Sequence, residues 1–377
     1  MKVSIVDCEA YEPEQVYKAI KESLAKIDFR IPENKKVLLK PNILGQNPPK
    51  DFVTTNPIFV EAASKIFLEK GNKVIIGESS GFHLDGGTSR AFEISGIKQV
   101  ADKHNIQLEN FEKHKVRHIH DEKAAIYKNL EISGLIFDVD LIVSLPKLKT
   151  HTLVKYTGAI KNLFGTVPGG RKQKLHGIAQ KESDFAQVLV YVYQNVRPSL
   201  SIMDGIVGLE GNGPGSSGIP KKTGIILASQ NAAALDIVAS EIIGYDPMKV
   251  YTNKYSIERG LINPNEIEII GNKRIINYKK PITAPTIASP IVGWVMKQGA
   301  MKPYCIKKNC KKCQICMKVC PVNAIKMAPY PVIDKKKCIS CYCCHENCQY
   351  KAMGLKGSLI FETARKAKNT LLKKLNK

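Results

Sequence analysis

The residues with the clearest chemistry are cysteines, because ten of the 11 in this 377-residue chain lie between positions 305 and 348. Eight of them form two runs with identical spacing, Cys310-x2-Cys313-x2-Cys316-x3-Cys320 and Cys338-x2-Cys341-x2-Cys344-x3-Cys348. A [4Fe–4S] cluster needs four converging thiolates. Zinc sites also use CxxC pairs, but typically two pairs rather than two triplets each followed by a fourth cysteine. The spacing therefore favours iron–sulfur clusters over zinc.

The double run resembles the bacterial-type two-cluster ferredoxin domain, including Pro321 after Cys320 and the apolar pair Ala324-Ile325. In that arrangement each cluster takes three cysteines from one run and the fourth from the other. The resemblance implies two [4Fe–4S] clusters with the ligand sets Cys310, Cys313, Cys316, Cys348 and Cys338, Cys341, Cys344, Cys320. Gln349 replaces the second proline of such domains, and we expect only a local change in backbone and hydrogen bonding.

Three cysteines lie outside this scheme. Cys343 and Cys305 are expected to be spare thiols, with a redox-active or alternative ligand role as the other interpretation. Cys8 ends an apolar run and is expected in the core.

A second group of candidates lies in the first 270 residues, where lysines follow apolar strand-like runs. Ligands bind outside the carboxyl ends of strands in open α/β sheets, and lysines there suit a carboxylate or phosphate. The candidate ligand-binding residues are Lys40, Asn42, Lys147, Lys149, Lys155, Lys161 and Asn162. His151 and Asp204 are candidates for proton transfer. Solvated lysines, an ordinary loop histidine and a metal-binding or helix-capping aspartate remain alternatives.

A glycine-rich loop is expected after Asp204, with six glycines between Gly205 and Gly218. Such a loop lets backbone N–H groups approach an anion, although a flexible turn explains it equally well. It matches neither the dinucleotide fingerprint nor the P-loop.

These segments also resemble a known family. The sequence KPN at 40–42, LPKLKTH at 145–151, GAIKNLFG at 158–165 and the Asp-Gly glycine-rich loop are similar to the domain of unknown function 362. The resemblance covers roughly residues 36 to 250. The family is usually described as iron–sulfur proteins of unknown activity, so the resemblance assigns no roles. It supports the following candidates only: Lys40, Asn42, Lys147, Lys149, His151, Lys161 and Asn162.

The elements that must position these residues alternate along the chain. Strands are predicted at 3–6, 37–39, 74–76, 141–144, 200–203, 224–227 and 266–270. Helices are predicted at 13–26, 57–70, 87–105, 184–195 and 232–243. This alternation predicts an α/β fold, with a mostly parallel sheet and flanking helices, plus a small C-terminal α+β ferredoxin-type domain.

The domain organisation follows from shifts in composition. We expect an α/β domain at 1–277, a linker at 278–303, a two-cluster ferredoxin-type domain at 304–353 and a basic amphipathic helix at 354–377. The net charge of +23 is uneven, since 18 Lys and Arg face 3 Asp and Glu from residue 302 onward. Few aromatic residues accompany this charge, which disfavours nucleic acid. The basic helix could contact an anionic membrane surface or a partner, but packing on the same chain is the simpler interpretation.

The sequence shows neither an export signal nor a stretch apolar enough to span a membrane, so we expect a cytoplasmic protein. The leading hypothesis is an iron–sulfur oxidoreductase that exchanges electrons with an anionic ligand in the α/β domain. One alternative is an electron carrier or assembly protein whose α/β domain docks a redox partner without catalysis. Another is a nucleotide- or phosphate-activated enzyme whose clusters are structural. Substrate, direction of electron flow and oligomeric state stay open.

Overall fold

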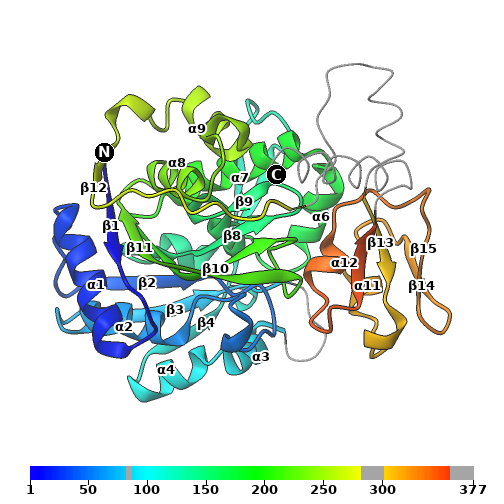
Figure 1. The fold of residues 1–377 in the computed structure, drawn as a ribbon, viewed down its shortest axis with the longest axis horizontal. Helices are drawn as coiled ribbons and strands as arrows, with labels where there is room; N and C mark the ends of the chain where they lie inside the picture. Colours follow the sequence, from blue (N-terminus) through cyan, green and yellow to red (C-terminus); the bar gives the residue numbers. More distant parts are fainter. Residues whose placement is uncertain (82–86, 282–300, 357–377) are drawn as a thin grey trace, which may run out of the picture.

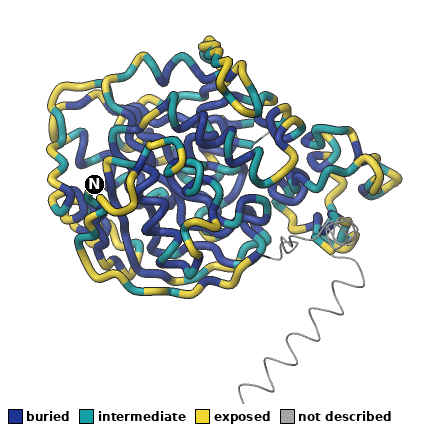
Figure 2. The backbone as a smooth tube through the Cα atoms, turned by 90° about the horizontal axis from the view of Figure 1, so that it is seen from above, coloured by how far each residue is buried: buried dark blue, intermediate teal, exposed yellow. Residues whose placement is uncertain are grey.

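The computed structural model describes residues 1–81, 87–281 and 301–356, which form a large α/β body and a small cysteine-rich body at its side (Figure 1). Buried residues are concentrated inside the large body, while the small body is mostly half-buried or exposed (Figure 2). The expected fold class is confirmed, because the main sheet is mostly parallel and helices cover both of its faces.

The large body is built on a ten-stranded sheet. Its main path runs β12 (Glu268–Ile270), β1 (Lys2–Asp7), β11 (Gly218–Ser229), β10 (Leu200–Gly211), β7 (Leu141–Leu145), β2 (Lys36–Pro41), β3 (Lys73–Glu78) and β4 (Gln107–Asn110). Only β11 pairs antiparallel to its neighbours on this path. Two further strands, β8 (Lys147–His151) and β9 (Lys155–Thr157), extend from β10. A separate hairpin joins β5 (Val116–His120) and β6 (Asn129–Ser133).

The strands are apolar on both faces because each face is covered. In β2, Val37 and Leu39 point into one hydrophobic core and Leu38 into the other, as the two-residue period of a strand requires. One face packs against α1 (Pro13–Lys26), α2 (Pro57–Leu68), α3 (Gly87–Ile94) and α4 (Ile97–Lys103). The other packs against α5 (Ala159–Asn162), α6 (Arg171–Ile178), α7 (Glu182–Val196), α8 (Ala232–Ile242) and α9 (Tyr251–Glu258).

The expected strands and helices recur with local differences. Asn56 caps α2 by accepting the N–H of Ile58, as the Asn-Pro start predicts. The single helix expected at 87–105 is two helices, because Gly96 adopts a left-handed conformation with φ of +79° between them. Both helices pack on the same face of the sheet.

Two segments expected to be loops are strands, and these expectations were wrong. The chain turns at Pro146 and continues as β8, so Lys147, Lys149 and His151 lie on a buried strand beside β10. Likewise β10 does not end at Met203 but runs through Asp204 to Gly211, with a bulge after Gly205. In both cases pairing with distant strands extends the segment, which local sequence cannot reveal.

The small body contains a repeat with an offset of 28 residues, as from Cys310 to Cys338. Its elements are β13 (Lys302–Cys305), α11 (Ile315–Lys318), β14 (Ile325–Met327), β15 (Pro331–Ile333), α12 (Cys343–Glu346) and β16 (Met353–Lys356). Left-handed backbone recurs at the same offset, at the pairs Lys312 and Ser340, Gln314 and Tyr342, and Asn323 and Lys351. The two cysteine runs therefore fold as two copies of one turn.

The small body extends slightly beyond the expected limits of 304 and 353, because β13 pairs with β16 from Lys302 to Lys356. Residues 354–356 thus belong to a strand, and the rest of the expected C-terminal helix lies outside the described residues. Most of the expected linker, residues 282–300, also lies outside them. Within the described part of the chain, no helix combines the length and apolar character needed to cross a membrane.

Candidate functional site

The two cysteine runs surround two cavities, and each cavity draws on both runs. One, of about 330 Å³, is lined by Cys310, Cys313, Cys316 and Cys348. The other, of about 300 Å³, is lined by Cys320, Cys338, Cys341 and Cys344. These are the two crossed ligand sets expected for a two-cluster domain. Among the described residues, no three Cys, His, Asp or Glu side chains are close enough to hold a single metal ion.

The chemistry of these thiols fits a cationic cluster. Burial and the neighbouring cysteines raise the pKa of Cys316 to about 12 and that of Cys344 well above its usual value. Such thiols become thiolates only when a metal offsets the charge. Backbone N–H groups already point at cysteine sulfurs, from Ala324 to Cys320 and from Ala352 to Cys348, each at 3.2 Å.

Gln349 does not disturb the second turn. The N–H···S bond at Cys348 has the same length as its counterpart at Cys320, which is followed by Pro321. Of the three remaining cysteines, Cys8 is buried in the core as expected. Cys305 lies beside the first set, and burial raises its pKa to about 11. Cys343 is buried and points at a third cavity.

The third cavity lies between the two bodies, and its empty space of about 590 Å³ includes space that is open to solvent. It is lined from the large body by Asn42, Ile43, Leu44, Glu78, Ser79, Gly81, Lys161, Asn162, Phe164, Gly165, Lys172, Gln173 and His176, and from α12 and the residue after it by Cys343, Glu346 and Asn347. We call it the interdomain cavity. The helix that carries Cys344 therefore also forms one wall of the interdomain cavity.

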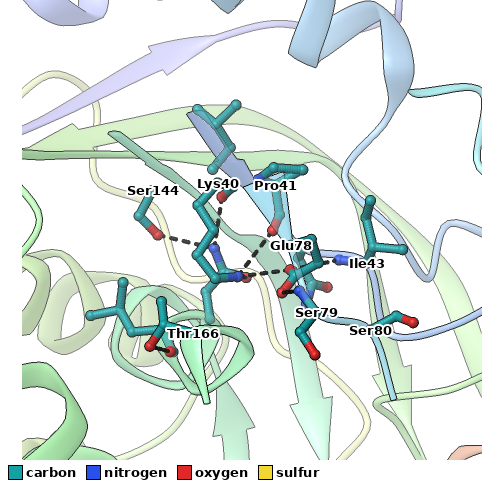
Figure 3. A network of polar contacts seen from close by, with 12 residues as sticks. Lys40, Pro41, Ile43, Glu78, Ser79, Ser80, Ser144 and Thr166 are labelled. Atoms are coloured by element: carbon teal, nitrogen blue, oxygen red, sulfur yellow. Dashed lines mark hydrogen bonds and ion pairs between the residues drawn. The ribbon is translucent and has the colours of Figure 1, made fainter. Parts of the chain in front are cut away.

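A buried network fixes the wall formed by the carboxyl ends of β2 and β3 (Figure 3). Lys40 Nζ donates to Glu78 Oε2 at 2.7 Å, and Asn162 Nδ2 donates to the Lys40 carbonyl at 3.1 Å and to Ser144 Oγ at 3.0 Å. Burial lowers the pKa of Lys40, while the Glu78 carboxylate opposes that shift. Gly165 must be glycine here, since a Cβ would lie 1.9 Å from Glu78 Oε1. Lys40 thus neutralises Glu78 and positions Asn162.

A second buried ion pair lies away from the interdomain cavity. Lys147 Nζ donates to Asp204 Oδ2 at 2.8 Å, and Asp204 also accepts from Tyr11 Oη at 2.8 Å and from the N–H of Asn56 at 3.0 Å. Burial lowers the pKa of Lys147. With these donors around its carboxylate, Asp204 joins β10 to β8 and α2. A catalytic role for Asp204 stays a prediction that its position does not favour.

Lys149 and His151 lie behind the cavity wall. Lys149 Nζ donates to Asn42 Oδ1 at 2.5 Å and to the Val53 carbonyl at 2.9 Å. Burial, together with the charges of Lys161 and Lys147, holds the pKa of Lys149 well below its usual value. Lys149 therefore orients Asn42, which does line the cavity.

His151 reaches toward the small body. Its Nδ1 accepts the N–H of Leu153 at 3.0 Å, which leaves the proton on Nε2, 3.5 Å from Glu346 Oε1. Burial and the nearby Lys161 charge hold the pKa of His151 well below its usual value. Burial raises the pKa of Glu346, while Lys161 and Lys149 oppose that shift. His151 therefore touches α12 rather than the cavity itself.

Lys161 is the cation best placed to meet a ligand. It lines the cavity, is partly exposed and makes no hydrogen bond or ion pair within the part of the chain that the structure describes. Lys172 also lines the cavity, but its Nζ donates to Ser79 Oγ at 2.8 Å and to the Ser80 carbonyl at 2.9 Å. Burial lowers the pKa of Lys172 to about 8. Lys155 is paired with Glu182 at 2.6 Å, outside the cavity lining.

The cavity residues that sequence reasoning missed include Glu78, Lys172, His176, Glu346 and Asn347. Lys172 and His176 are four residues apart on α6, a spacing that places both on one helix face and could have marked them. Burial lowers the pKa of His176 to about 3, and its ring stacks on Phe185. Glu346 is the single acidic residue within the second cysteine run, and this could have marked it as a candidate site residue.

The glycine-rich loop after β10 contacts α12 instead of lining the cavity. A Cβ on Gly215 would lie 2.7 Å from the Glu346 carbonyl, so glycine permits this close approach. Ser216 Oγ donates to the Cys348 carbonyl at 3.1 Å. His345 Nε2 lies 3.4 Å from the Asn212 carbonyl. The loop therefore docks the small body, and its expected role as an anion-binding loop stays without geometric support.

The family model described as "Domain of unknown function (DUF362)" matches residues 37–241. The chain belongs to the DUF362 family. The DUF362 domain thus covers β2 to α8 and holds every large-body residue that lines the interdomain cavity. A second model, the 4Fe-4S binding domain, matches residues 306–326. The chain is accordingly an iron–sulfur protein with a binding domain for at least one [4Fe–4S] cluster.

The chain also has a curated relative and a more distant structural neighbour. The chain is similar to a thylakoid-associated protein from Synechocystis sp., with 32% identity over 271 residues that cover 71% of this chain and 82% of that protein. Among solved structures, the lactate racemase apoprotein from Thermoanaerobacterium thermosaccharolyticum aligns with a TM-score of 0.42 and 15% identity. That alignment covers 64% of this chain and 56% of the racemase, and a likeness of this degree carries no argument about the site.

Proposed function

We propose that this DUF362 protein holds two [4Fe–4S] clusters and exchanges electrons with a small anionic molecule bound in the interdomain cavity. The observation that carries the proposal is that residues of both bodies line this cavity. The DUF362 domain contributes two lysines and two asparagines to its walls, and the cysteine-bearing helix α12 contributes Cys343 and Glu346. When bound, the clusters supply one-electron chemistry that protein side chains lack.

The 28-residue repeat supports the count of two clusters. Each copy presents three cysteines on one turn and gives its fourth to the other cavity, so the two cavities are chemically equivalent. The N–H···S bonds at Cys320 and Cys348 repeat in the same way. Both sets consist of four cysteines with the same spacing, which supports counting both as ligand sets.

The protein side chains have separate tasks in this proposal. Lys161 binds the anion, with Lys172 as a second positive charge on the same wall. Asn42 is held in place by Lys149 and offers its amide N–H groups, whereas Asn162 shapes the wall because its N–H groups are engaged by the Lys40 carbonyl and Ser144. His151 acts as a positioning residue, since its Nε2–H faces the Glu346 carboxyl group. We place the protein in the cytoplasm, because cysteines intended for metal need a reducing compartment.

Two measurements test the proposal. After anaerobic reconstitution we expect about eight irons and eight sulfides per chain, with a reduced EPR spectrum of interacting [4Fe–4S] clusters. Four irons per chain would contradict the second cluster.

Thermal-shift titrations with small carboxylates and phosphate then test the cavity. We expect Lys161→Met to weaken binding of a stabilising anion by about tenfold or more, the value of a hydrogen bond to a charged group. Lys155→Met is the matched control, because its partner Glu182 lies outside the cavity lining. Equal affinities in the two variants, or no anion that stabilises the wild type, would refute the site.

A further inference from the structure

The two sets of cysteines differ in their exposure to solvent at one matching position. Cys313 of the first set is exposed, whereas Cys341, its counterpart in the second set, is buried. The first cavity is also lined by the exposed residues Lys311, Gln314 and Tyr350. A cluster held there would lie near the protein surface, which is where a protein partner can reach it.

The surface around that cavity is strongly cationic. From residue 302 to residue 333 the chain has seven lysines and neither Asp nor Glu. Four of the lysines are exposed on both sides of Cys310: Lys307, Lys308, Lys311 and Lys312. We call them the lysine face. None makes an ion pair within the described residues, and Lys307 and Lys312 lie over the Tyr330 ring at 5.8 and 5.0 Å from its centroid.

Acidic residues of the small body do not offset this charge. The described part of that body contains only Asp334 and Glu346. Glu346 is buried against the interdomain cavity, and the Asp334 carboxylate accepts the N–H groups of Lys336 and Lys337. The lysine face is therefore open for an external anion, and its size suits a protein surface better than a single small ion.

We propose that the lysine face is the docking site of an acidic one-electron carrier protein, of ferredoxin or flavodoxin type. The inference rests on the proposed electron-transfer function and names the partner that exchanges electrons with it. Charge complementarity would bring an acidic surface to the rim of the Cys310–Cys313 turn and raise the association rate. Anionic membranes and nucleic acids also attract lysines, but neither explains why these lysines surround the more exposed thiols.

Binding to a defined probe tests the proposal without relying on activity. The probe is a plant-type [2Fe–2S] ferredoxin, which is acidic, titrated into the reconstituted full-length protein by calorimetry at 50 mM NaCl. We expect Lys311→Glu plus Lys312→Glu to weaken binding by at least about tenfold, and 500 mM NaCl to weaken wild-type binding similarly. The matched control, Lys50→Glu plus Lys123→Glu, makes the same charge change at exposed positions of the large body and should bind like the wild type.

Three outcomes would overturn the inference: equal loss in the two variants, no salt dependence, or failure of the ferredoxin to bind. It would also be overturned if the lysine-face variant lost affinity only for phosphatidylglycerol vesicles or single-stranded DNA, which are titrated in parallel.

Dithionite reduction followed by EPR separates this inference from the proposed function. If the clusters of both variants are reduced normally by dithionite and both variants bind ferredoxin equally, the proposed docking site is wrong while the cluster assignment stands. If the wild type neither holds nor reduces clusters, the proposed function fails first.

Discussion

Two buried lysine–carboxylate pairs lie in the main sheet, and only one of them belongs to the candidate site. Lys40–Glu78 and Lys147–Asp204 have nearly equal distances, 2.7 and 2.8 Å, and neither lysine is exposed. Glu78 lines the interdomain cavity, whereas Asp204 is enclosed by Tyr11, Lys147 and the backbone of Asn56. Position relative to α12, rather than the ion pair itself, separates the two roles.

The largest effect on stability should come from breaking the enclosed ion pair, Lys147–Asp204. Lys147→Met leaves Asp204 buried without its counter-charge, which we expect to cost about 3–5 kcal/mol of unfolding free energy. Because the pair does not touch the cavity, anion affinity of the folded protein should stay unchanged. Chemical denaturation and an anion titration on the same sample measure both quantities. Stability close to that of the wild type would mean that water or another donor reaches Asp204.

A third buried carboxylate, Asp236, has no lysine partner among the residues that the structure describes, and it should make stability depend on pH. Asp236 accepts from Tyr156 Oη at 3.0 Å and from the N–H groups of Ala159 and Ile160 at 2.6 and 2.9 Å, which fixes the start of α5. Burial raises the pKa of Asp236 to about 7. The folded state then binds a proton that the unfolded chain releases near pH 4, so stability falls as pH rises from about 4 to about 7.

Asp236→Asn should remove this slope, which amounts to about 2–4 kcal/mol across the interval. Denaturation midpoints of wild type and variant at several pH values provide the measurement. Parallel curves for the two proteins would show that the three hydrogen bonds keep Asp236 ionised throughout.

The smallest effect on stability should follow from breaking the pair at the cavity. Lys40→Met leaves Glu78 beside a cavity where water or a ligand can solvate it, so we expect a loss of about 1–3 kcal/mol. The uncompensated negative charge should also weaken anion binding, which Lys147→Met does not do. If both variants lose equal stability and neither changes anion affinity, the proposed distinction between the pairs is wrong.

The same two pairs show which parts of the site the sequence could reveal. Lys40 and Lys147 were predicted to be site residues because they lie at or beyond the ends of apolar strands, and this local pattern was enough to identify them. Their partners are 38 and 57 residues away in sequence, so nothing local indicated that Lys40 and Lys147 would be neutralised and buried. Short spacings explain why three cysteines of each run lie on one turn, whereas the fourth comes from the other run, and the two ligand sets stay a prediction.

The interdomain cavity itself was not predictable. Glu346 and Asn347 lie within a cysteine run whose spacing already seemed fully explained by metal ligation. Their place in the cavity wall depends on how α12 packs on the DUF362 domain. That packing is determined by the close approach at Gly215 and by the contact of Ser216 with Cys348. Those contacts join segments more than a hundred residues apart, as the bond from Ser216 to Cys348 spans 132.

The crossed lining of the two cysteine cavities also bears on how the small body arose. Each copy of the 28-residue repeat supplies three thiols to one cavity and a single thiol to the other. A lone ancestral copy could have completed neither cavity by itself, but two such peptides related by a twofold axis could have completed both. Gene duplication and fusion would then have converted a symmetric homodimer into one chain, after which the copies could diverge, one toward solvent and the other toward the DUF362 domain.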